Sequence, residues 1–455
     1  MSVGPHDAPC LVPGVAQRER GGRHLFIHPR RPRWVLLNAM AAGLARRLDG
    51  RRTLRALAAE VAAGAGVPTA RVETDLLDLA ARLRELGFLE AGARAAEGPQ
   101  PFVLGSLFLR LTDACNLRCT QCYADSGGAW RPSAAELSTS EVCALLAELR
   151  DAGGRAVTFS GGEPLLRPDL SELAAEARRL GLQVTIVTNG TRLDPTSVAR
   201  LLPLVDHLQV SLDGATAPAH DALRGRGSFE AVLAGLRAVV AAGGAARLRL
   251  SCTLLAENLD SALALPALAR SLGVRCVRYV NVVSDGRARG RWARMVPPHD
   301  RLLAFYERLF FELPADPHME IGHGLHGFFP QVPDEMACNS QYCPVSLTPA
   351  VAPGGDVFPC SMFERPAHRV GNVRTDGGLT GVLRGGGLQR VREALRRRPD
   401  EVPACRACDW RGPCQGGCAA VAEMTTGTTN APDGHCDIRD SLYMRLIFGA
   451  AEARA

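Results

Sequence analysis

Lysine is absent from this sequence of 455 residues, and its 53 basic residues are all arginine. A phosphate-binding P-loop uses a lysine, and pyridoxal enzymes and aldolases form a Schiff base on a lysine amine, so both chemistries are excluded. Long apolar runs are also absent, because none approaches the roughly 18 residues that a membrane-spanning helix requires. The N-terminus lacks the basic and apolar segments of a secretory signal. We therefore expect a cytoplasmic protein with no membrane contact.

Aromatic residues are scarce, at 5% of the chain, but apolar residues make up 46%, as in globular proteins. The length is sufficient for two or three domains. The formal net charge of +6 is modest, and it falls further if clustered cysteines bind cationic clusters as thiolates. We therefore expect no nucleic-acid partner. The basic run LRRRP at residues 395–399 is interpreted as a solvated helix end.

Cysteine is abundant, with 15 residues in the chain. In a reducing compartment, clustered thiols are metal ligands or catalysts more often than disulfide partners. Eleven of the cysteines fall into tight groups. The four scattered cysteines are Cys10, Cys143, Cys252 and Cys276. They are interpreted as small buried hydrophobic residues, except that the role of Cys10 is left open.

Three zones follow one another along the chain. In the first, residues 31–50 predict a strand that leads into a helix, and residues 53–66 and 72–90 predict amphipathic helices. In the second, residues 104–285, six β-rich runs alternate with helical stretches. This alternation predicts an α/β fold with a parallel sheet, either open or curled into a partial barrel. The third zone, from Cys338 onward, is rich in Cys, Gly and Pro and has little periodicity, so we expect metal ligation to stabilise it.

Four unusual segments lie at the ends of predicted strands of the second zone. They are CNLRCTQC from Cys115, GGEP from Gly161, TNG from Thr188 and SLDG from Ser211. The carboxyl ends of parallel strands form one rim of a sheet, where ligands bind. We therefore expect these segments to meet.

The first segment presents Cys115, Cys119 and Cys122 without a fourth ligand nearby. Structural zinc requires four ligands, and no histidine lies close to these cysteines in the sequence. A cubane iron–sulfur cluster held by three thiolates has one iron open to bind a substrate. The spacing thus favours a cluster with an open iron over a structural zinc site.

These motifs resemble the C-x3-C-x2-C signature and the accompanying loops of radical S-adenosylmethionine (SAM) enzymes, over residues 104–285. The resemblance implies a partial (β/α)6 TIM-like barrel and a [4Fe–4S] cluster whose open iron chelates SAM. One electron then cleaves SAM to methionine and a 5′-deoxyadenosyl radical, which abstracts hydrogen from the substrate. The implied SAM-binding residues are Tyr123, Gly161, Gly162, Glu163, Asn189, Ser211 and Arg224.

Each implied SAM contact has a physical rationale. The two glycines let the backbone approach the cofactor, Glu163 accepts hydrogen bonds from the ammonium group, and Arg224 pairs with the carboxylate. Tyr123 resembles the family's aromatic residue near the adenine, and Asn189 and Ser211 would contact the ribose or the carboxylate. A role in a turn or in core packing is the alternative for four of these residues, namely Tyr123, Asn189, Ser211 and Arg224.

The third zone has eight cysteines with the spacing C-x4-C-x16-C, followed by C-x2-C-x5-C-x3-C-x17-C. This pattern resembles the SPASM extension of radical enzymes that modify peptides, and a zinc ribbon is the alternative. The resemblance implies two further [4Fe–4S] clusters, three in all, with complete ligation and roles in electron transfer and scaffolding. The first auxiliary cluster would take Cys338, Cys343, Cys360 and Cys418, and the second Cys405, Cys408, Cys414 and Cys436.

One departure from that pattern concerns the catalytic base. Sulfatase-maturing members carry an aspartate directly after the cysteine that matches Cys360, and this sequence has Ser361 there. Sulfatase maturation is therefore disfavoured, although Asp356 or Glu364 could take the place of that aspartate. No catalytic residue is assigned from the sequence.

Residues 24–89 resemble the PqqD-like winged-helix domain that recognises leader peptides, through WVLLN, LDGRRTLRAL and LRELGFLE; a generic helical cap on the barrel is the alternative. The domains are therefore expected at 1–96 (PqqD-like), 97–325 (partial barrel) and 326–455 (SPASM). A leader would add a strand to the first domain's edge, and the precursor's core segment would enter the barrel.

These expectations combine into a cytoplasmic maturase of a ribosomally synthesised peptide, which forms an intrapeptide crosslink. A flavodoxin or ferredoxin would supply electrons. Two alternatives stay open. The first is a radical SAM enzyme that modifies tetrapyrrole side chains in a haem pathway, which the segments CNLRCTQCYADSG and ELST also resemble. The second is a non-catalytic, zinc-rich binding module.

Overall fold

The computed structural model describes residues 3–31, 33–90, 104–131, 133–314, 316–325 and 348–449. The predicted cluster ligands Cys338 and Cys343 lie outside these ranges. Within them, no helix combines the length and the apolar character that crossing a membrane would require.

The N-terminal part folds around its own hydrophobic core, which includes Phe26, Leu54, Leu76 and Phe88. The predicted strand and helices are present, but the hairpin that precedes them was not anticipated, because one of its strands is largely polar. Asn38 and Thr53 cap the first two helices by accepting backbone hydrogen bonds. The elements are the antiparallel strands β1 (Ala16–Arg20), β2 (Arg23–Ile27) and β3 (Trp34–Asn38) and the helices α1 (Ala39–Arg46), α2 (Leu54–Ala65) and α3 (Thr69–Glu85).

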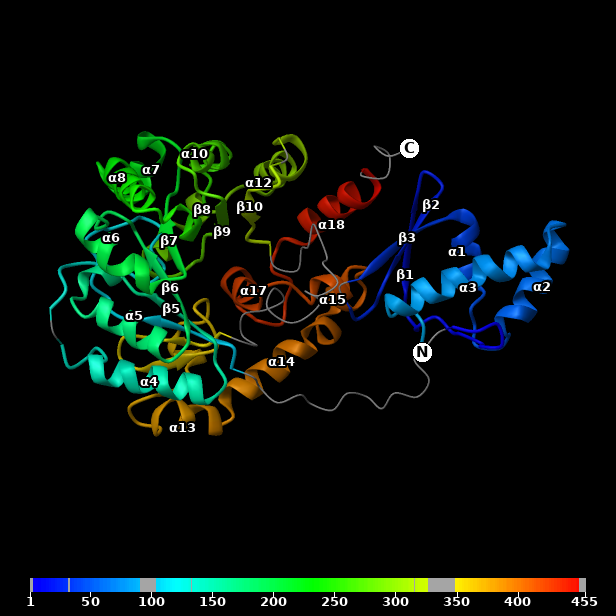
Figure 1. The fold of residues 1–455 in the computed structure, drawn as a ribbon, viewed down its shortest axis with the longest axis horizontal. Helices are drawn as coiled ribbons and strands as arrows, with labels where there is room; N and C mark the ends of the chain where they lie inside the picture. Colours follow the sequence, from blue (N-terminus) through cyan, green and yellow to red (C-terminus); the bar gives the residue numbers. More distant parts are fainter. Residues whose placement is uncertain are drawn as a thin grey trace.

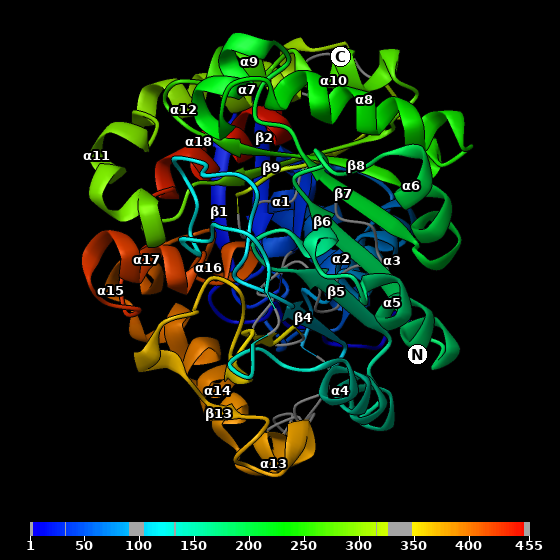
Figure 2. The ribbon, with the colours of Figure 1, turned by 90° about the vertical axis from the view of Figure 1, so that its left-hand side faces the viewer.

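The six predicted parallel strands are all present and adjoin one another in chain order. Helices lie on the outer side of the curved sheet (Figure 2). The strands are β4 (Ser106–Arg110), β5 (Ala156–Ser160), β6 (Gln183–Thr188), β7 (His207–Ser211), β8 (Leu248–Leu254) and β9 (Cys276–Asn281). The main helices between them are α4 (Thr139–Asp151), α5 (Leu170–Arg179), α6 (Pro195–Leu201), α7 (Ala217–Arg224), α8 (Ser228–Ala241) and α10 (Leu265–Ser271). Ser138 caps α4 in a capping box with Glu141.

Four short strands extend this sheet to ten and were not predicted. Strand β10 (Glu320–Gly322) runs parallel to β9 at one edge, and β11 (Ala350–Val351) runs parallel to β4 at the other. Strands β12 (Asp356–Phe358) and β13 (Gly371–Asn372) continue from β11. Segments of two or three residues carry no detectable periodicity, which is why the sequence did not show them.

The third zone contains more helix than its composition indicated. Its helices are α13 (Gly378–Arg384), α14 (Gly387–Glu401), α15 (Pro403–Arg406), α16 (Arg411–Cys414), α17 (Ala419–Thr426) and α18 (Cys436–Met444). The interpretation of LRRRP as a solvated helix end is wrong for Arg398, which is 4% exposed inside α14. Its guanidinium donates hydrogen bonds to the carbonyls of Thr429, Gly417 and Ala431, at 2.6, 3.1 and 2.8 Å.

The N-terminal sheet packs on the C-terminal region, which lies between it and the barrel (Figure 1). Arg18 of β1 forms ion pairs with Asp409 and Asp440, at 2.8 and 2.5 Å. Gly412 approaches the N-terminal domain so closely that a Cβ there would lie 2.1 Å from the carbonyl oxygen of His28. Because Asp409 directly follows Cys408, the surface on which the N-terminal domain docks borders the second predicted auxiliary thiol set.

A test of this packing replaces Arg398 with methionine. The variant leaves three carbonyl groups without their donor, of which that of Gly417 is buried and those of Thr429 and Ala431 are partly buried. A buried unsatisfied group costs about 1–3 kcal/mol, and a group that water can reach costs less. We expect faster hydrogen exchange over residues 417–431 and a lower unfolding midpoint of the metal-loaded protein. Arg397→Met is the matched control, because Arg397 is 59% exposed and its ion pair with Glu401 lies on the surface. Equal exchange in the two variants would contradict a structural role for Arg398.

Candidate active site

The loop that carries Cys115, Cys119 and Cys122 is held against the loop after β5. The backbone N–H groups of Gly162 and Glu163 donate hydrogen bonds to the carbonyls of Thr112 and Ala114, at 2.7 and 2.8 Å. The cysteine loop also closes on itself through a bridge between Cys115 and Gly128. The carboxyl ends of β4 and β5 thus present one continuous surface.

The two glycines of GGEP make this contact possible. Gly161 has φ +141°, and a Cβ there would lie 2.5 Å from the carbonyl oxygen of Thr112. A Cβ at Gly162 would lie 2.2 Å from the carbonyl oxygen of Ala114. The glycines therefore admit the cysteine loop itself, a role beyond the cofactor approach expected from the sequence.

Glu163 is fully buried and joins the loops after β5 and β6. Its carboxylate accepts hydrogen bonds from the hydroxyl of Thr188 at 2.7 Å and from the backbone N–H groups of Asn189 and Leu165, at 2.7 and 3.1 Å. Burial raises the pKa of Glu163, although these donors oppose the shift. A carboxylate has about four acceptor positions, so three internal donors leave room for an ammonium group.

Asn189 lies directly beside the cysteine loop. Its Nδ2 donates to Oδ1 of Asn116 at 2.9 Å and lies 3.9 Å from Sγ of Cys115. Asn189 therefore orients Cys115 in addition to any ligand it contacts.

Ser211, another residue of the implied SAM site, ends β7 and is half-buried.

Asp213 is a buried hub that the sequence did not assign, although it lies within SLDG. Its Oδ2 accepts hydrogen bonds from Nε2 of Gln121 and Nε of Arg224, both at 2.6 Å, and its Oδ1 accepts one from the N–H of Thr253 at 2.8 Å. Burial disfavours the charge on Arg224, but Asp213 outweighs this and raises the pKa of the guanidinium. Arg224 thus stays a cation beside Cys119. Spacing along the chain cannot reveal such a hub, because its partners come from different elements.

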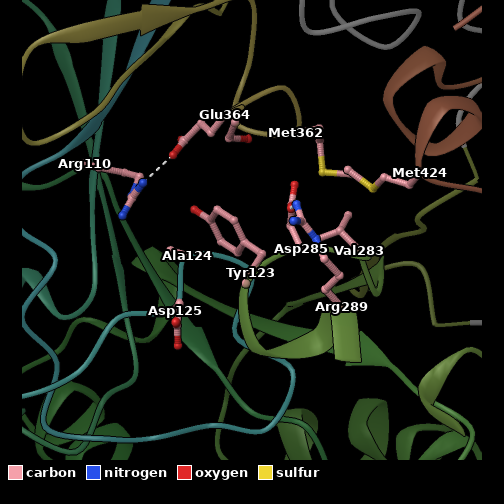
Figure 3. A pocket seen from close by; sticks show the side chains of 12 residues that line it. Arg110, Tyr123, Ala124, Asp125, Val283, Asp285, Arg289, Met362, Glu364 and Met424 are labelled. Carbon is pink, nitrogen blue, oxygen red and sulfur yellow. Dashed lines mark hydrogen bonds and ion pairs between the residues drawn. The ribbon is translucent and has the colours of Figure 1, made fainter. Parts of the chain in front are cut away.

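Tyr123 lies in a cavity between the barrel and the C-terminal region (Figure 3). The cavity has a volume of about 320 Å³, and its wall includes Arg110 and Glu364. The structure therefore places Tyr123 opposite an ion pair from two distant parts of the chain, whereas the sequence suggested only an adenine contact.

The three front thiols fit a cluster better than a single ion. Each of Cys119 and Cys122 is close enough to Cys115 to raise its pKa, which burial brings to about 11. Yet in the described ranges no three His, Cys, Asp or Glu side chains are close enough to share one metal ion. A cubane binds each thiolate through a different iron, so its three ligands need not lie within reach of one ion.

The second predicted auxiliary set also converges in the structure. Cys405 lies within electrostatic range of Cys408 and Cys414, and Cys436 lies within range of Cys405 and Cys414. Fully buried Arg439 lies beside this set, where its cation offsets thiolate charge. Of the first auxiliary set, Cys360 and Cys418 are described, and they belong to one small hydrophobic cluster.

Arg439 is fixed by Asp433, whose carboxylate also accepts a hydrogen bond from the N–H of Cys418 at 2.9 Å. Burial opposes the charge of Asp433, but Arg439 outweighs it and lowers the pKa of the carboxyl group. This pair thus connects the segments that carry Cys418 and Cys436.

Three family profiles match the chain. Residues 109–262 match the radical SAM superfamily, residues 23–89 match coenzyme PQQ synthesis protein D, and residues 343–409 match the SPASM iron-sulfur cluster-binding domain. The matches fall on the barrel, the N-terminal domain and the cysteine-rich region.

Curated relatives align with most of the chain. The mycofactocin maturase of Mycobacterium tuberculosis is 31% identical, over 72% of this chain and 81% of its own length. The AdoMet-dependent heme synthase of Methanosarcina barkeri is 30% identical, over 72% of this chain and 95% of its own length. The PqqA peptide cyclase of Streptomyces rochei is 30% identical, over 73% and 89% of the two chains.

Among solved structures, SuiB of Streptococcus suis bound to S-adenosylmethionine covers 93% of this chain and 98% of its own, with a TM-score of 0.56 and 15% identity. This likeness shows that the barrel with its N- and C-terminal regions is a known arrangement. The expected partial barrel with a SPASM domain is thereby confirmed. The match of sequence, of motif positions and of fold establishes that this chain belongs to the radical SAM superfamily, whose members use an iron–sulfur cluster and SAM, and that it carries PqqD-type and SPASM domains.

Proposed function

We propose that this enzyme matures a ribosomally synthesised precursor peptide by forming a crosslink within it. The observation that carries the proposal is a PqqD-type domain docked on the region with the second thiol set, through Arg18, Asp409 and Asp440. One relative is named a peptide cyclase, and SuiB is known in a structure with its precursor peptide SuiA. We place the reaction in the cytoplasm, where thiols are kept reduced and remain able to bind iron–sulfur clusters.

The N-terminal domain offers a strand edge for the leader. Strands β1 and β3 form the two edges of its sheet. Strand β1 has charged, largely exposed residues, whereas β3 is apolar and half-buried and is followed by Met40, which is 70% exposed. An extended peptide would therefore find backbone partners at the edge of β3, with the exposed side chain of Met40 beside them.

The chain's own residues prepare the radical site. Bound there, the cluster and SAM supply the 5′-deoxyadenosyl radical. The spare acceptor position of Glu163 suits the ammonium group of SAM. Arg224 is held through Nε by Asp213, and among the described residues its two terminal nitrogens have no hydrogen-bond partner, which suits a carboxylate.

Further features of the proposal concern redox partners and organisation. The auxiliary thiol sets would carry electrons and hold the C-terminal region, and a flavodoxin or ferredoxin would reduce the front cluster. We assign residues 1–96 to peptide recognition, 97–325 to radical chemistry and 326–455 to the SPASM domain. The new bond is a carbon–carbon, carbon–oxygen or thioether link.

Haem-pathway chemistry is the second candidate, because a heme synthase is as similar in sequence as the peptide cyclase. The PqqD-type domain argues against it, since a tetrapyrrole has no backbone to pair with a strand. Conversion of a tetrapyrrole, without a change in any peptide, would favour this candidate.

The front cysteines provide the first test. Cys119→Ala removes one of three ligands, so we expect loss of SAM cleavage, measured as 5′-deoxyadenosine by liquid chromatography. Iron content should fall by about a third if one of three clusters is lost. Cys143→Ala, on α4 outside every thiol set, is the control and should keep both values. Normal SAM cleavage by Cys119→Ala would refute the assignment of this site.

The substrate class has its own test. Reconstituted, reduced enzyme is incubated with SAM and, in turn, with each peptide encoded by a short reading frame beside its gene. We expect one peptide to lose about 2 Da, because a crosslink removes two hydrogen atoms, and to give fragments that remain joined in tandem mass spectrometry. Cleavage of SAM with every such peptide unchanged would contradict the proposal.

A further inference from the structure

The cavity around Tyr123 lies between two ligand loops of different predicted clusters. Tyr123, Ala124 and Asp125 directly follow Cys122, and Ser361, Met362 and Glu364 closely follow Cys360. A group bound here would therefore lie close to the radical source and close to an auxiliary thiol set. This is the position that a crosslinking substrate needs, because it gives up a hydrogen atom and then an electron.

Glu364 and Arg110 form a buried ion pair in the wall of this cavity (Figure 3). Their side chains are 7% and 9% exposed, and Nη1 of Arg110 lies 2.5 Å from Oε2 of Glu364. The second carboxylate oxygen, Oε1, is buried and has no hydrogen-bond partner among the described residues, and the same holds for Nε of Arg110. Buried polar atoms are seldom left unpaired in native proteins, so both atoms point to a polar ligand.

The other carboxylates of the cavity are already engaged. Asp125 pairs with Arg287 at 2.8 Å, and Asp285 pairs with Arg289 and Arg365, at 2.5 and 2.7 Å. Glu364 is the carboxylate of this wall that combines deep burial with an unused oxygen.

The surroundings of Glu364 favour proton uptake. The ionisable groups that face it are Arg110, Asp113, Tyr123 and Asp285. Burial raises the pKa of Glu364 above its ordinary value, Arg110 opposes this shift only in part, and the two aspartates add to it. A carboxylate with a raised pKa is a stronger base than an ordinary surface glutamate.

We propose that Glu364 is the catalytic base that takes the proton released when the crosslink closes; this inference rests on the proposed function. The 5′-deoxyadenosyl radical takes a hydrogen atom from the first substrate group. The second group loses its proton to Oε1 of Glu364 as the new bond forms. One electron remains, and an oxidised iron–sulfur cluster bound by the auxiliary thiols would accept it, so that atoms and electrons balance.

Asp356, the other carboxylate considered near Cys360, is unsuited to this role. It lies on β12, is 39% exposed, and binds Arg369 and Asn372, each at 2.8 Å. It is not part of the cavity wall, so Asp356→Asn is a matched control for a substitution at Glu364.

The test uses Glu364→Gln in the full-length, iron-loaded enzyme, with the peptide that the wild type modifies, deuterated at the abstracted position. Glutamine keeps the size and an acceptor for Arg110 but cannot take a proton. We expect crosslinked product to form about 100-fold more slowly, while deuterium still enters 5′-deoxyadenosine at a rate within about threefold of wild type. The ratio of product to 5′-deoxyadenosine falls accordingly, and Asp356→Asn keeps the wild-type ratio.

The pH profile separates a base from a merely structural residue. Crosslinking by the wild type should decline as the pH falls through the raised pKa of Glu364, because the protonated carboxyl cannot act as a base. The Glu364→Gln variant should lack this decline. An unchanged product ratio, the same acidic decline, or loss of deuterium transfer together with product would each overturn the role of Glu364. If the wild type modifies no peptide, the proposed function itself fails, and this inference with it.

Discussion

The backbone contact between the cysteine loop and the GGEP loop is the constraint on which the active site depends. Two hydrogen bonds join Gly162 and Glu163 to Thr112 and Ala114. The contact leaves no space for a Cβ at Gly161 or at Gly162. The Glu163 carboxylate then binds the end of β6 and the loop after it, because it accepts hydrogen bonds from the hydroxyl of Thr188 and the backbone N–H of Asn189. Three strand ends are thereby held in one fixed arrangement, which a site for an open iron and a sulfonium ligand requires.

Buried arginines balance the negative charge of this chain at three separate places. Arg224 pairs with Asp213 near the front thiols, Arg439 pairs with Asp433 near the auxiliary thiols, and Arg110 pairs with Glu364 in the cavity. Arginine suits such positions, because its guanidinium remains charged when buried and binds a carboxylate while keeping other donors free. A sequence without lysine can therefore bury several charged groups close to clusters that carry further charge.

Sequence patterns revealed the barrel and the thiols but not the contacts that organise them. The six parallel strands are visible because each is a run of β-branched and apolar residues between helical stretches. Asp213 was overlooked as a hub, because its partners Gln121, Arg224 and Thr253 are brought together only by the tertiary fold. The same reason applies to Arg398: Arg396 and Arg397 before it are exposed, whereas its own side chain donates to carbonyls of segments far along the chain, before and after α17.

The cysteine-rich region is an integral part of the barrel, which constrains how the enzyme can work. Strand β11 pairs with β4, the strand that leads into the radical site, and Arg365 pairs with Asp285 in the loop after β9. Both edges of the six-stranded core are therefore attached to this region. The N-terminal sheet packs on the later part of the same region, where Arg18 pairs with Asp409 and Asp440. The cysteine-rich region thus contacts both the strand that leads to the front cysteines and the N-terminal domain, so three zones of the sequence form one packed unit.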